Sequence, residues 1–393
     1  MAETPASADI GFRVAEFLSR HPVDEDPLEF LRARFGEGLA HVSWPLGRGG
    51  LGLDATVQSL VDRLFREAGA PDNAPHKNVI GLGMAGPTLL EWASDDLLDR
   101  LLRPLWTGEE IWCQLFSEPG AGSDLAAAGT RAIRDGDDWV VTGQKVWTSL
   151  AHEARWALLI ARTDPDAPKH VGLTYFVCDM TAPGIDVRAL RQLTGEAEFN
   201  EVFLDEVRIP DAMRLGDVGQ GWRVTQSTLS HERVAIGAGV PPRGSGPIGH
   251  LVRAWASASD EDRERLGEDR VIQLWIEAEA LRLSSVMLRE SGEGGPAGAA
   301  AKIAFARIAQ DVSSAEMDLA GESALDYDDW TLRRPDLDAE ESRPGSYRYL
   351  RTKANSIEGG TTEVLRNIVS ERLLGLPAEV RTDVGVPWKE LVR

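Results

Sequence analysis

The order of local sequence patterns constrains the fold of this chain most. Residues 1 to about 110 read as helices, because apolar residues recur at helical spacing. From 111 to about 230 the chain consists of short runs rich in β-branched and aromatic residues, such as WVVTGQKVW and NEVFLDEVRIP, and Asp135-Gly136 is typical of a hairpin turn. From 231 to 393 long, alanine-rich amphipathic helices return. This order differs from the repeating βαβ pattern of a doubly wound sheet. It predicts an α+β fold, mostly α, with a helical domain at 1–110, a β-domain at 111–230 and a helical domain at 231–393.

Composition narrows the classes of partner. The 393 residues are 42% hydrophobic, enough for a sizeable core, and carry a net charge of −21. This charge argues against nucleic acid or an anionic membrane surface as the main partner. Cys113 and Cys178, the only two cysteines, give neither a metal-ligand spacing nor a disulfide framework. The amino-terminal residues lack the basic start and apolar core of a signal peptide, and apolar runs such as WALLIA are too short to span a bilayer. We therefore expect a soluble cytoplasmic protein without a metal site.

Two segments leave more than one interpretation open. GLGMAG at 81–86 matches the G-x-G-x-x-G fingerprint of dinucleotide-binding folds, but only NVI is available as a preceding strand. The alternative is a glycine-rich helix start that packs tightly against its neighbours. Residues 324–350 are expected to form a loop or extended excursion that shapes either a pocket or a subunit contact.

Three longer motifs carry the strongest functional signal. SEPGAGSD (117–124), VVTGQKVWTS (140–149) and IEGGTTEVLRNIVSERLLGLP (357–377) occur in this order. Together with FNEVFLDEVRIP at 199–210, they closely resemble the acyl-CoA dehydrogenase family over nearly the whole chain. The resemblance implies a helical N-terminal domain, a middle β-barrel domain and a C-terminal four-helix bundle. It also implies flavin adenine dinucleotide (FAD) between barrel and bundle, and α,β-dehydrogenation of an acyl-CoA thioester.

The resemblance assigns cofactor contacts in all three motifs. The glycines of GAGSD let a ligand approach the backbone, whose N–H groups favour an anion, although the stretch also reads as a tight turn capped by Ser and Asp. Trp147 matches the tryptophan beside the flavin ring, with ordinary core packing as the alternative, and Ser149 matches the hydroxyl that reaches the reactive nitrogen. Thr148 takes that role if the register differs by one residue. Glu363 stands where glutamine is common, and it also suits the first turn of a helix. The expected cofactor-binding residues are Phe116, Ser117, Gly122, Ser123, Trp147, Ser149, Thr361 and Glu363, with Ser123 also near the thioester.

The catalytic base has two candidate positions. Many family members place a glutamate directly before the Gly-Thr pair that opens the last helix, and here Gly359 occupies that place, with Glu358 one residue earlier. Other members take the glutamate from a Glu-Arg pair on a bundle helix, which matches Glu232 and Arg233. We expect Glu232 to be the base, Arg233 to orient it in contact with the substrate, and the Gly359 N–H to bind the thioester oxygen. Glu358 remains the rival base.

Two departures from the family pattern affect the expected assembly. The family's R-x-x-F-G motif, which clamps a neighbouring subunit's cofactor, is represented only by RERLG at 263–267, and Asp318 stands where glutamine is usual. Such divergence is similar to that of actinobacterial members acting on steroid side-chain thioesters, some of which pair two unlike subunits. The expected partners are an acyl-CoA, an electron-transfer flavoprotein or other acceptor, and further subunits in a homodimer, homotetramer or heterotetramer. The alternatives are a flavin oxidase or monooxygenase on the same scaffold, or a non-catalytic subunit.

Overall fold

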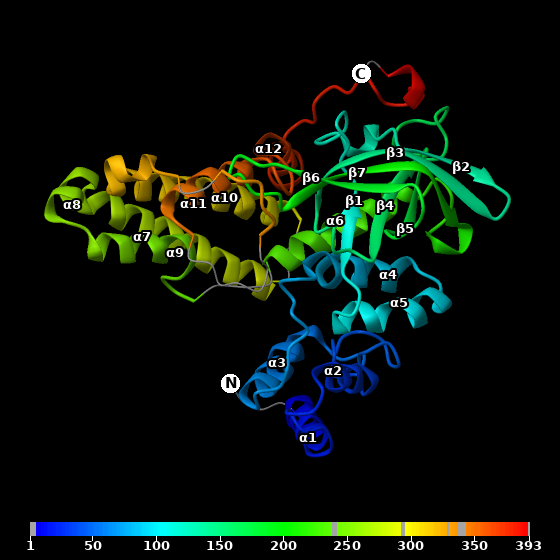
Figure 1. The fold of residues 1–393 in the computed structure, drawn as a ribbon, viewed down its shortest axis with the longest axis horizontal. Coiled ribbons are helices and arrows are strands. Elements are labelled where there is room, and N and C mark those ends of the chain that lie inside the picture. Colours follow the sequence, from blue (N-terminus) through cyan, green and yellow to red (C-terminus); the bar gives the residue numbers. More distant parts are fainter. Residues whose placement is uncertain (1–4, 238–241, 292–294, 328–329, 336–342, 392–393) are drawn as a thin grey trace.

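Three groups of elements make up the molecule (Figure 1). The structure is a computed structural model that describes residues 5–237, 242–291, 295–327, 330–335 and 343–391, with only the backbone at 5–8, 232–237 and 289–291. A sheet and its flanking helices lie on one side of Figure 1, the C-terminal helices extend to the other, and α1–α3 lie below. This arrangement follows the predicted order of helices, strands and helices.

The N-terminal region is helical, as predicted. Phe17, Phe30 and Phe65 pack edge to face with ring centroids 5.2–6.1 Å apart, and they form the core of its first part. The stretch PTLLEWASDDLLDRLLRPLW contains two helices, because the Ser94 hydroxyl accepts the Leu97 N–H and begins the second one. The helices are α1 (Pro5–Arg20), α2 (Pro27–Gly36), α3 (Gln58–Glu67), α4 (Gly86–Trp92) and α5 (Asp95–Thr107).

The middle region forms one eight-stranded sheet in the order β6-β7-β3-β2-β4-β5-β8, with β1 paired in parallel to β4. Every residue of β4 is buried, as are six of the seven residues of β5, which explains why their sequences are continuous apolar runs. The turn at Asp135-Gly136 joins β2 to β3 as predicted, with Gly136 at φ 64°. The strands are β1 (Trp112–Leu115), β2 (Arg131–Asp135), β3 (Asp138–Ser149), β4 (Trp156–Arg162), β5 (Leu173–Asp179), β6 (Ile185–Leu190), β7 (Phe199–Pro210) and β8 (Arg214–Leu215).

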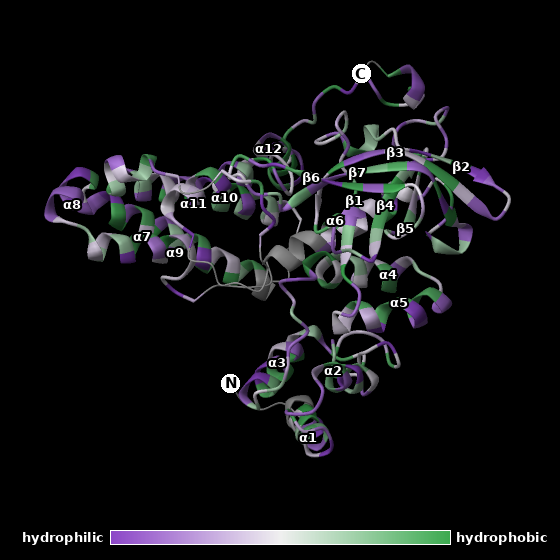
Figure 2. Ribbon diagram, in the orientation of Figure 1, coloured by the Kyte–Doolittle hydropathy of each residue, from purple (hydrophilic) through white to green (hydrophobic). Residues whose placement is uncertain are grey.

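The C-terminal helices form a bundle around α10. Leu251, Leu274, Ile308 and Val312 join α7, α9 and α10 in a small apolar core. Figure 2 shows the hydrophilic α8 at the far end of this bundle. Helix α6 runs across residue 230 and packs on β5 and α4. No helix in the described ranges is long and apolar enough to cross a membrane. The helices are α6 (Gly221–Gly237), α7 (Gly246–Ser257), α8 (Asp260–Leu266), α9 (Glu268–Ser291), α10 (Pro296–Ala320), α11 (Gly345–Thr352) and α12 (Thr362–Ile368).

The predicted excursion at 324–350 is wrong at its end, where α11 begins at Gly345 because Pro344 precedes it with extended backbone. Residues 328–329 and 336–342 of the excursion lie outside the described residues. The described part contacts the sheet region: the Tyr327 hydroxyl donates to the Thr194 carbonyl at 2.7 Å, and the Ala197 N–H donates to the Arg333 carbonyl at 2.8 Å. The excursion therefore ties the bundle to the loop between β6 and β7.

GLGMAG forms no dinucleotide fingerprint. Gly81–Ala85 is a π-helical turn, η2, that leads directly into α4, and residues 79–80 before it are helical rather than a strand. A Cβ on Gly81 would lie 2.2 Å from the Asn78 side chain, which accepts the Trp112 N–H. The glycine permits this close packing, so the tight helix start is confirmed.

Candidate functional site

The 117–124 motif is a tight turn held from beneath by a buried ion pair. The N–H groups of Glu118 and Ala121 each donate to the other residue's carbonyl at 3.0 Å. The Lys145 ammonium, which is 0% exposed, donates to Glu118 Oε1 at 2.8 Å and to the carbonyls of Phe116 and Ile160 at 3.0 and 2.9 Å. The Ser117 carbonyl accepts the Val146 N–H at 2.8 Å. These bonds fix the motif against β3.

The outer edge of the turn offers free backbone donors. Gly122 and Ser123 are exposed. In the part of the chain that the structure describes, their N–H groups donate to no protein acceptor. Lys169 lies close by and pairs with Asp124 at 2.6 Å and with Asp383 at 2.6 Å. Lys169 is thus already neutralised, and it is the unpaired N–H groups that suit an anionic ligand group.

Trp147 and Ser149 lie where β3 bulges. The pairing of β3 with β7 shifts register between Lys145 and Thr148, and Trp147 adopts φ 60° in the bulge. Its side chain is 56% exposed and meets Phe199 edge to face at 5.9 Å. Trp147 is therefore not a core residue, and its ring is available to a ligand. Thr148 is 1% exposed, whereas Ser149 is partly accessible, so the surroundings favour Ser149 of the two hydroxyls.

Gly359 lies in an exposed turn before α12. Gly359 and Gly360 have φ 62° and 95°, in the left-handed region that favours glycine. Among the described residues no acceptor pairs with the Gly359 N–H. Thr361 ends the turn, since its hydroxyl accepts the Val364 N–H at 3.2 Å and caps α12, while Glu363 is exposed in the first turn of this helix. The N–H of Gly359 is thus open to an acceptor from outside the described residues.

A charged bridge links this turn to the middle domain. Arg351 Nη1 lies 3.2 Å from both carboxylate oxygens of Glu358, and its Nε lies 3.4 Å from Glu198 Oε2. Burial raises the pKa of Glu198, Arg351 opposes this rise and the neighbouring Glu358 adds to it. The Arg351 guanidinium also lies 5.9 Å from the Phe199 ring, which touches Trp147. The structure therefore connects the Gly359 turn to Trp147 through two side chains.

The expected base lies on α6. Glu232 and Arg233 belong to the backbone of this helix, but their side chains lie outside the described residues. One turn earlier, the buried Thr228 hydroxyl bonds to the hydroxyls of Thr88 and Tyr175, each at 3.0 Å. These contacts fix the rotation of α6 directly before the candidate base.

Arg263, the first residue of RERLG, is engaged inside its own bundle. Its guanidinium donates to the carbonyls of Trp255 at 3.0 Å and Ala256 at 2.8 Å. Arg265 likewise donates to the carbonyls of Asp318 and Leu319. Both arginines therefore close the ends of the α7 and α10 helices.

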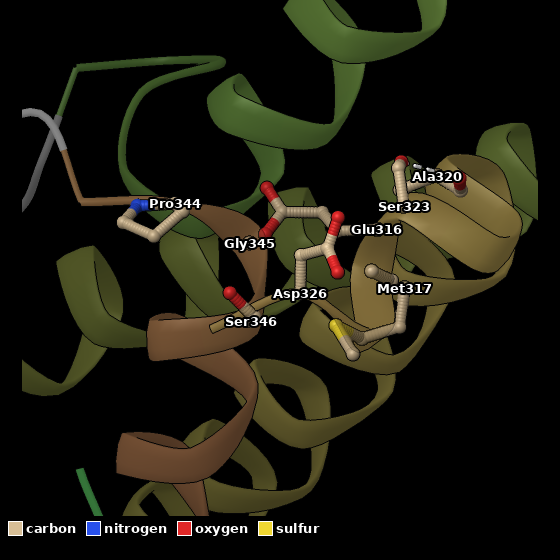
Figure 3. A pocket seen from close by; sticks show the side chains of 9 residues that line it. Glu316, Met317, Ala320, Ser323, Asp326, Pro344, Gly345 and Ser346 are labelled. Carbon is tan, nitrogen blue, oxygen red and sulfur yellow. Dashed lines mark hydrogen bonds between the residues drawn. The ribbon is translucent and has the colours of Figure 1, made fainter. Parts of the chain in front are cut away.

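A pocket of about 270 Å³ lies elsewhere, between α10 and α11. Figure 3 shows Glu316 and Asp326 facing this pocket, with Met317 and Ser346 at its edge. Glu316 is already paired with Arg348 at 2.8 Å. None of the expected site residues lines it, and the described residues hold no cluster of His, Cys, Asp or Glu able to bind a metal ion.

Sequence reasoning missed the side chains that support these loops. Glu118 and Lys145 stand inside the motifs themselves, and a lysine within a strand-like apolar run signals a buried partner. Arg351 lies outside every motif, and so does Lys302, which donates from α10 to the carbonyls of Asn355 and Gly360. Only the packing of α10 and α11 against the Gly359 turn identifies them.

Comparisons with known proteins agree with this geometry. Residues 113–207 match the profile of the acyl-CoA dehydrogenase middle domain, and residues 219–374 match that of the acyl-CoA dehydrogenase C-terminal domain. The acyl-CoA dehydrogenase IpdE1 of Mycolicibacterium smegmatis is 35% identical over 357 residues, which cover 88% of this chain and 86% of IpdE1. The acyl-CoA dehydrogenase FadE34 of Mycobacterium tuberculosis is 40% identical over 344 residues, and the match covers 86% of this chain but only 45% of FadE34.

Solved structures show the same fold. The ChsE4-ChsE5 complex from Mycobacterium tuberculosis aligns over 96% of this chain and 100% of the compared chain, with a TM-score of 0.68 and 25% identity. A protein described as the Tcur3481-Tcur3483 steroid ACAD aligns over 96% of this chain and 99% of its own, with a TM-score of 0.67 and 24% identity. The matched motifs, the order of domains and these comparisons together show that the chain belongs to the acyl-CoA dehydrogenase family.

Proposed function

We propose that this protein catalyses FAD-dependent α,β-dehydrogenation of an acyl-CoA thioester to the trans-2-enoyl-CoA. The observation that carries the proposal is the N–H of Gly359, which has no acceptor within the described ranges. Its turn is connected to the exposed Trp147 through Arg351 and Phe199. Dehydrogenation of a thioester needs a donor for the oxygen on which negative charge develops. It also needs a hydride acceptor beside the reacting carbons, and the exposed ring of Trp147 would flank a flavin in that position.

The residues of this chain fit a flavin dinucleotide. Trp147 presents an exposed ring, Ser149 offers a hydroxyl two residues further along β3, and the Phe116–Ser117 backbone is fixed by Lys145 and β3. The free N–H groups of Gly122 and Ser123 suit phosphate or thioester oxygens, and Thr361 and Glu363 would reach the adenosine half. When bound, FAD supplies the acceptor for the hydride from the β-carbon.

We assign the base to Glu232 rather than Glu358. A glutamate at position 359 itself would be strained by the φ of 62°. Glu358 is held through both oxygens by Arg351, so moving it to a substrate α-carbon would break that ion pair. Helix α6 is anchored one turn before Glu232 through Thr228. Glu232 would remove the α-proton while the Gly359 N–H stabilises the developing enolate oxygen, and Arg233 would orient the carboxylate.

We further propose, first, that the substrates are bulky, steroid-like thioesters. We propose, second, that this chain assembles with further subunits, either identical or related. The similarity to IpdE1 and to the fold of the steroid ACAD supports the first part. The fold shared with a chain of the ChsE4-ChsE5 complex supports the second. Because Arg263 is held by carbonyls of its own bundle, the subunit contact would not use this arginine in its present position to clamp a neighbouring subunit's cofactor. An electron-transfer flavoprotein or another acceptor would reoxidise the enzyme.

The test is an anaerobic titration of the purified flavoprotein with short, branched and steroid-like acyl-CoA thioesters, followed by the loss of flavin absorption. We expect bleaching by the bulky class. The Glu232→Gln variant should bleach at least about 100-fold more slowly than wild type, whereas Glu358→Gln should change the rate less than about tenfold. A yellow protein that no thioester bleaches, but that consumes oxygen, would instead identify an oxidase. A protein that is colourless alone and yellow only with a partner would identify a subunit of a heteromer.

A further inference from the structure

The turn that carries Gly359 is clamped by a lysine from another helix. Lys302 on α10 donates to the Asn355 carbonyl at 2.7 Å and to the Gly360 carbonyl at 2.9 Å. Asn355 and Gly360 flank Gly359 on its two sides. One ammonium group therefore holds both ends of the short segment that presents the Gly359 N–H.

The flexibility of the Gly359–Gly360 backbone explains why this turn needs such a clamp. Gly359 and Gly360 are consecutive glycines, so their backbone has more conformational freedom than any other pair. Fixing a flexible backbone costs conformational entropy, and the left-handed conformations of this turn must be kept against that cost. Hydrogen bonds from a charged donor are shorter and stronger than neutral ones, which makes an ammonium suited to this task.

Other contacts hold the same segment from the side of α10. Gln310 donates to the Thr352 carbonyl at 3.1 Å and to the Ser356 hydroxyl at 3.2 Å. These two contacts lie before the turn, whereas Lys302 bonds on both sides of Gly359. Lys302 is thus the side chain whose loss would free the turn itself and leave the preceding segment attached.

We infer that Lys302 is a positioning residue for the thioester oxygen, acting through the Gly359 N–H. It touches neither the reacting carbons nor the oxygen, but it sets the place and direction of the donor that does. An oxyanion donor works only within a narrow range of distance from the developing charge, and a misplacement of about 1 Å can cost about 100-fold in rate. This inference rests on the proposed function.

The experiment separates enolate stabilisation from hydride transfer. A 3-thia-acyl-CoA has sulfur at the β-position and releases no hydride, so the bound thioester can only lose its α-proton. The enolate beside oxidised flavin gives a long-wavelength charge-transfer absorption, and its pH midpoint measures how well the oxygen is stabilised. Wild type is compared with Lys302→Met, with Lys302→Arg as the conservative variant, and with Arg307→Met, which removes an exposed cation from the same helix.

For Lys302→Met we expect the midpoint of the charge-transfer band to rise by about one pH unit and kcat to fall about 10- to 100-fold, with KM changed less than about threefold. Lys302→Arg should recover at least half of the midpoint shift, and Arg307→Met should match wild type. A wild-type midpoint and kcat in folded, flavin-loaded Lys302→Met would overturn the positioning role alone. A wild-type protein that no thioester reduces, and that forms no enolate, would overturn the proposed function and this inference with it.

Lys302→Gln covers the case in which the methionine variant does not fold. Glutamine keeps two N–H donors without the charge, and it should raise the midpoint above that of wild type by less than about one pH unit. If Lys302→Gln folds, binds flavin and shows the wild-type midpoint and kcat, the ammonium clamp has no part in holding the donor.

Discussion

Replacing Lys145 with methionine should destabilise the middle domain and release the motif that it supports. The ammonium is 0% exposed and makes three hydrogen bonds, to Glu118 and to the carbonyls of Phe116 and Ile160. Burial is the largest influence on its pKa and lowers it, while the charge of Glu118 opposes this. Methionine fills a similar volume but satisfies none of these three acceptors.

The size of the destabilisation depends on the acceptors that Lys145→Met leaves without a donor. Breaking a buried ion pair by removing one partner costs about 3–5 kcal/mol, because the other charge stays buried without compensation. Glu118 keeps the N–H groups of Gly129 and Thr130 as donors at 2.7 and 2.9 Å, which reduces the cost. The two orphaned carbonyls add about 1–3 kcal/mol each where no water reaches them. At the low end of each range these contributions come to about 5 kcal/mol, and because Glu118 keeps two donors we expect a loss of about 4 kcal/mol in the free energy of unfolding.

The assay is urea unfolding followed by tryptophan fluorescence, since Trp112, Trp139 and Trp156 are buried in this domain. The matched control is the double variant Lys145→Met, Glu118→Gln, which removes the unpaired charge and should recover about 1–2 kcal/mol of the loss. A Lys145→Met protein within about 1 kcal/mol of wild type would refute the reasoning, as would a double variant less stable than the single one.

Three further predictions concern single contacts. Hydrogen bonds from Arg214 and Trp139 lower the pKa of Asp211 from 3.8 to about 2. The ionised Asp211 carboxylate should therefore stabilise the folded protein by about 1 kcal/mol after allowance for partial exposure. This contribution should be complete above pH 4 and disappear as the pH falls to about 2. The Asp211→Asn variant should lack this pH dependence in acid unfolding curves. Gly359→Ala should lose about 1–2 kcal/mol of stability, because alanine is strained at φ 62°, and unchanged urea midpoints would contradict this. Thr361→Ala removes the cap of α12 and should cost about 1 kcal/mol, whereas Thr361→Ser should cost less in the same measurement.

Several features of the site were accessible from sequence because their signals are local. The glycines of the 117–124 and 357–361 motifs, the strand run that ends in Trp147, and the helix cap at Thr361 each depend on neighbours within a few residues. The exposure of Trp147 was not accessible in this way, because it arises from a bulge in the pairing of β3 with β7. The start of α11 was not accessible either, because Pro344 stands at the N-cap position and no side chain caps this helix.

The sequence by itself determined the order of helices and strands, the family and the motifs that face the proposed ligands. These follow from periodicity and from residues adjacent in the chain. Only the tertiary structure decided which charges support the motifs: Lys145 beneath Glu118, Arg351 on Glu358, and Lys302 across the Gly359 turn. The last of these contacts joins residues more than 50 positions apart. Such partners are chosen by the packing of α10 against the turn, which no local pattern in the sequence encodes.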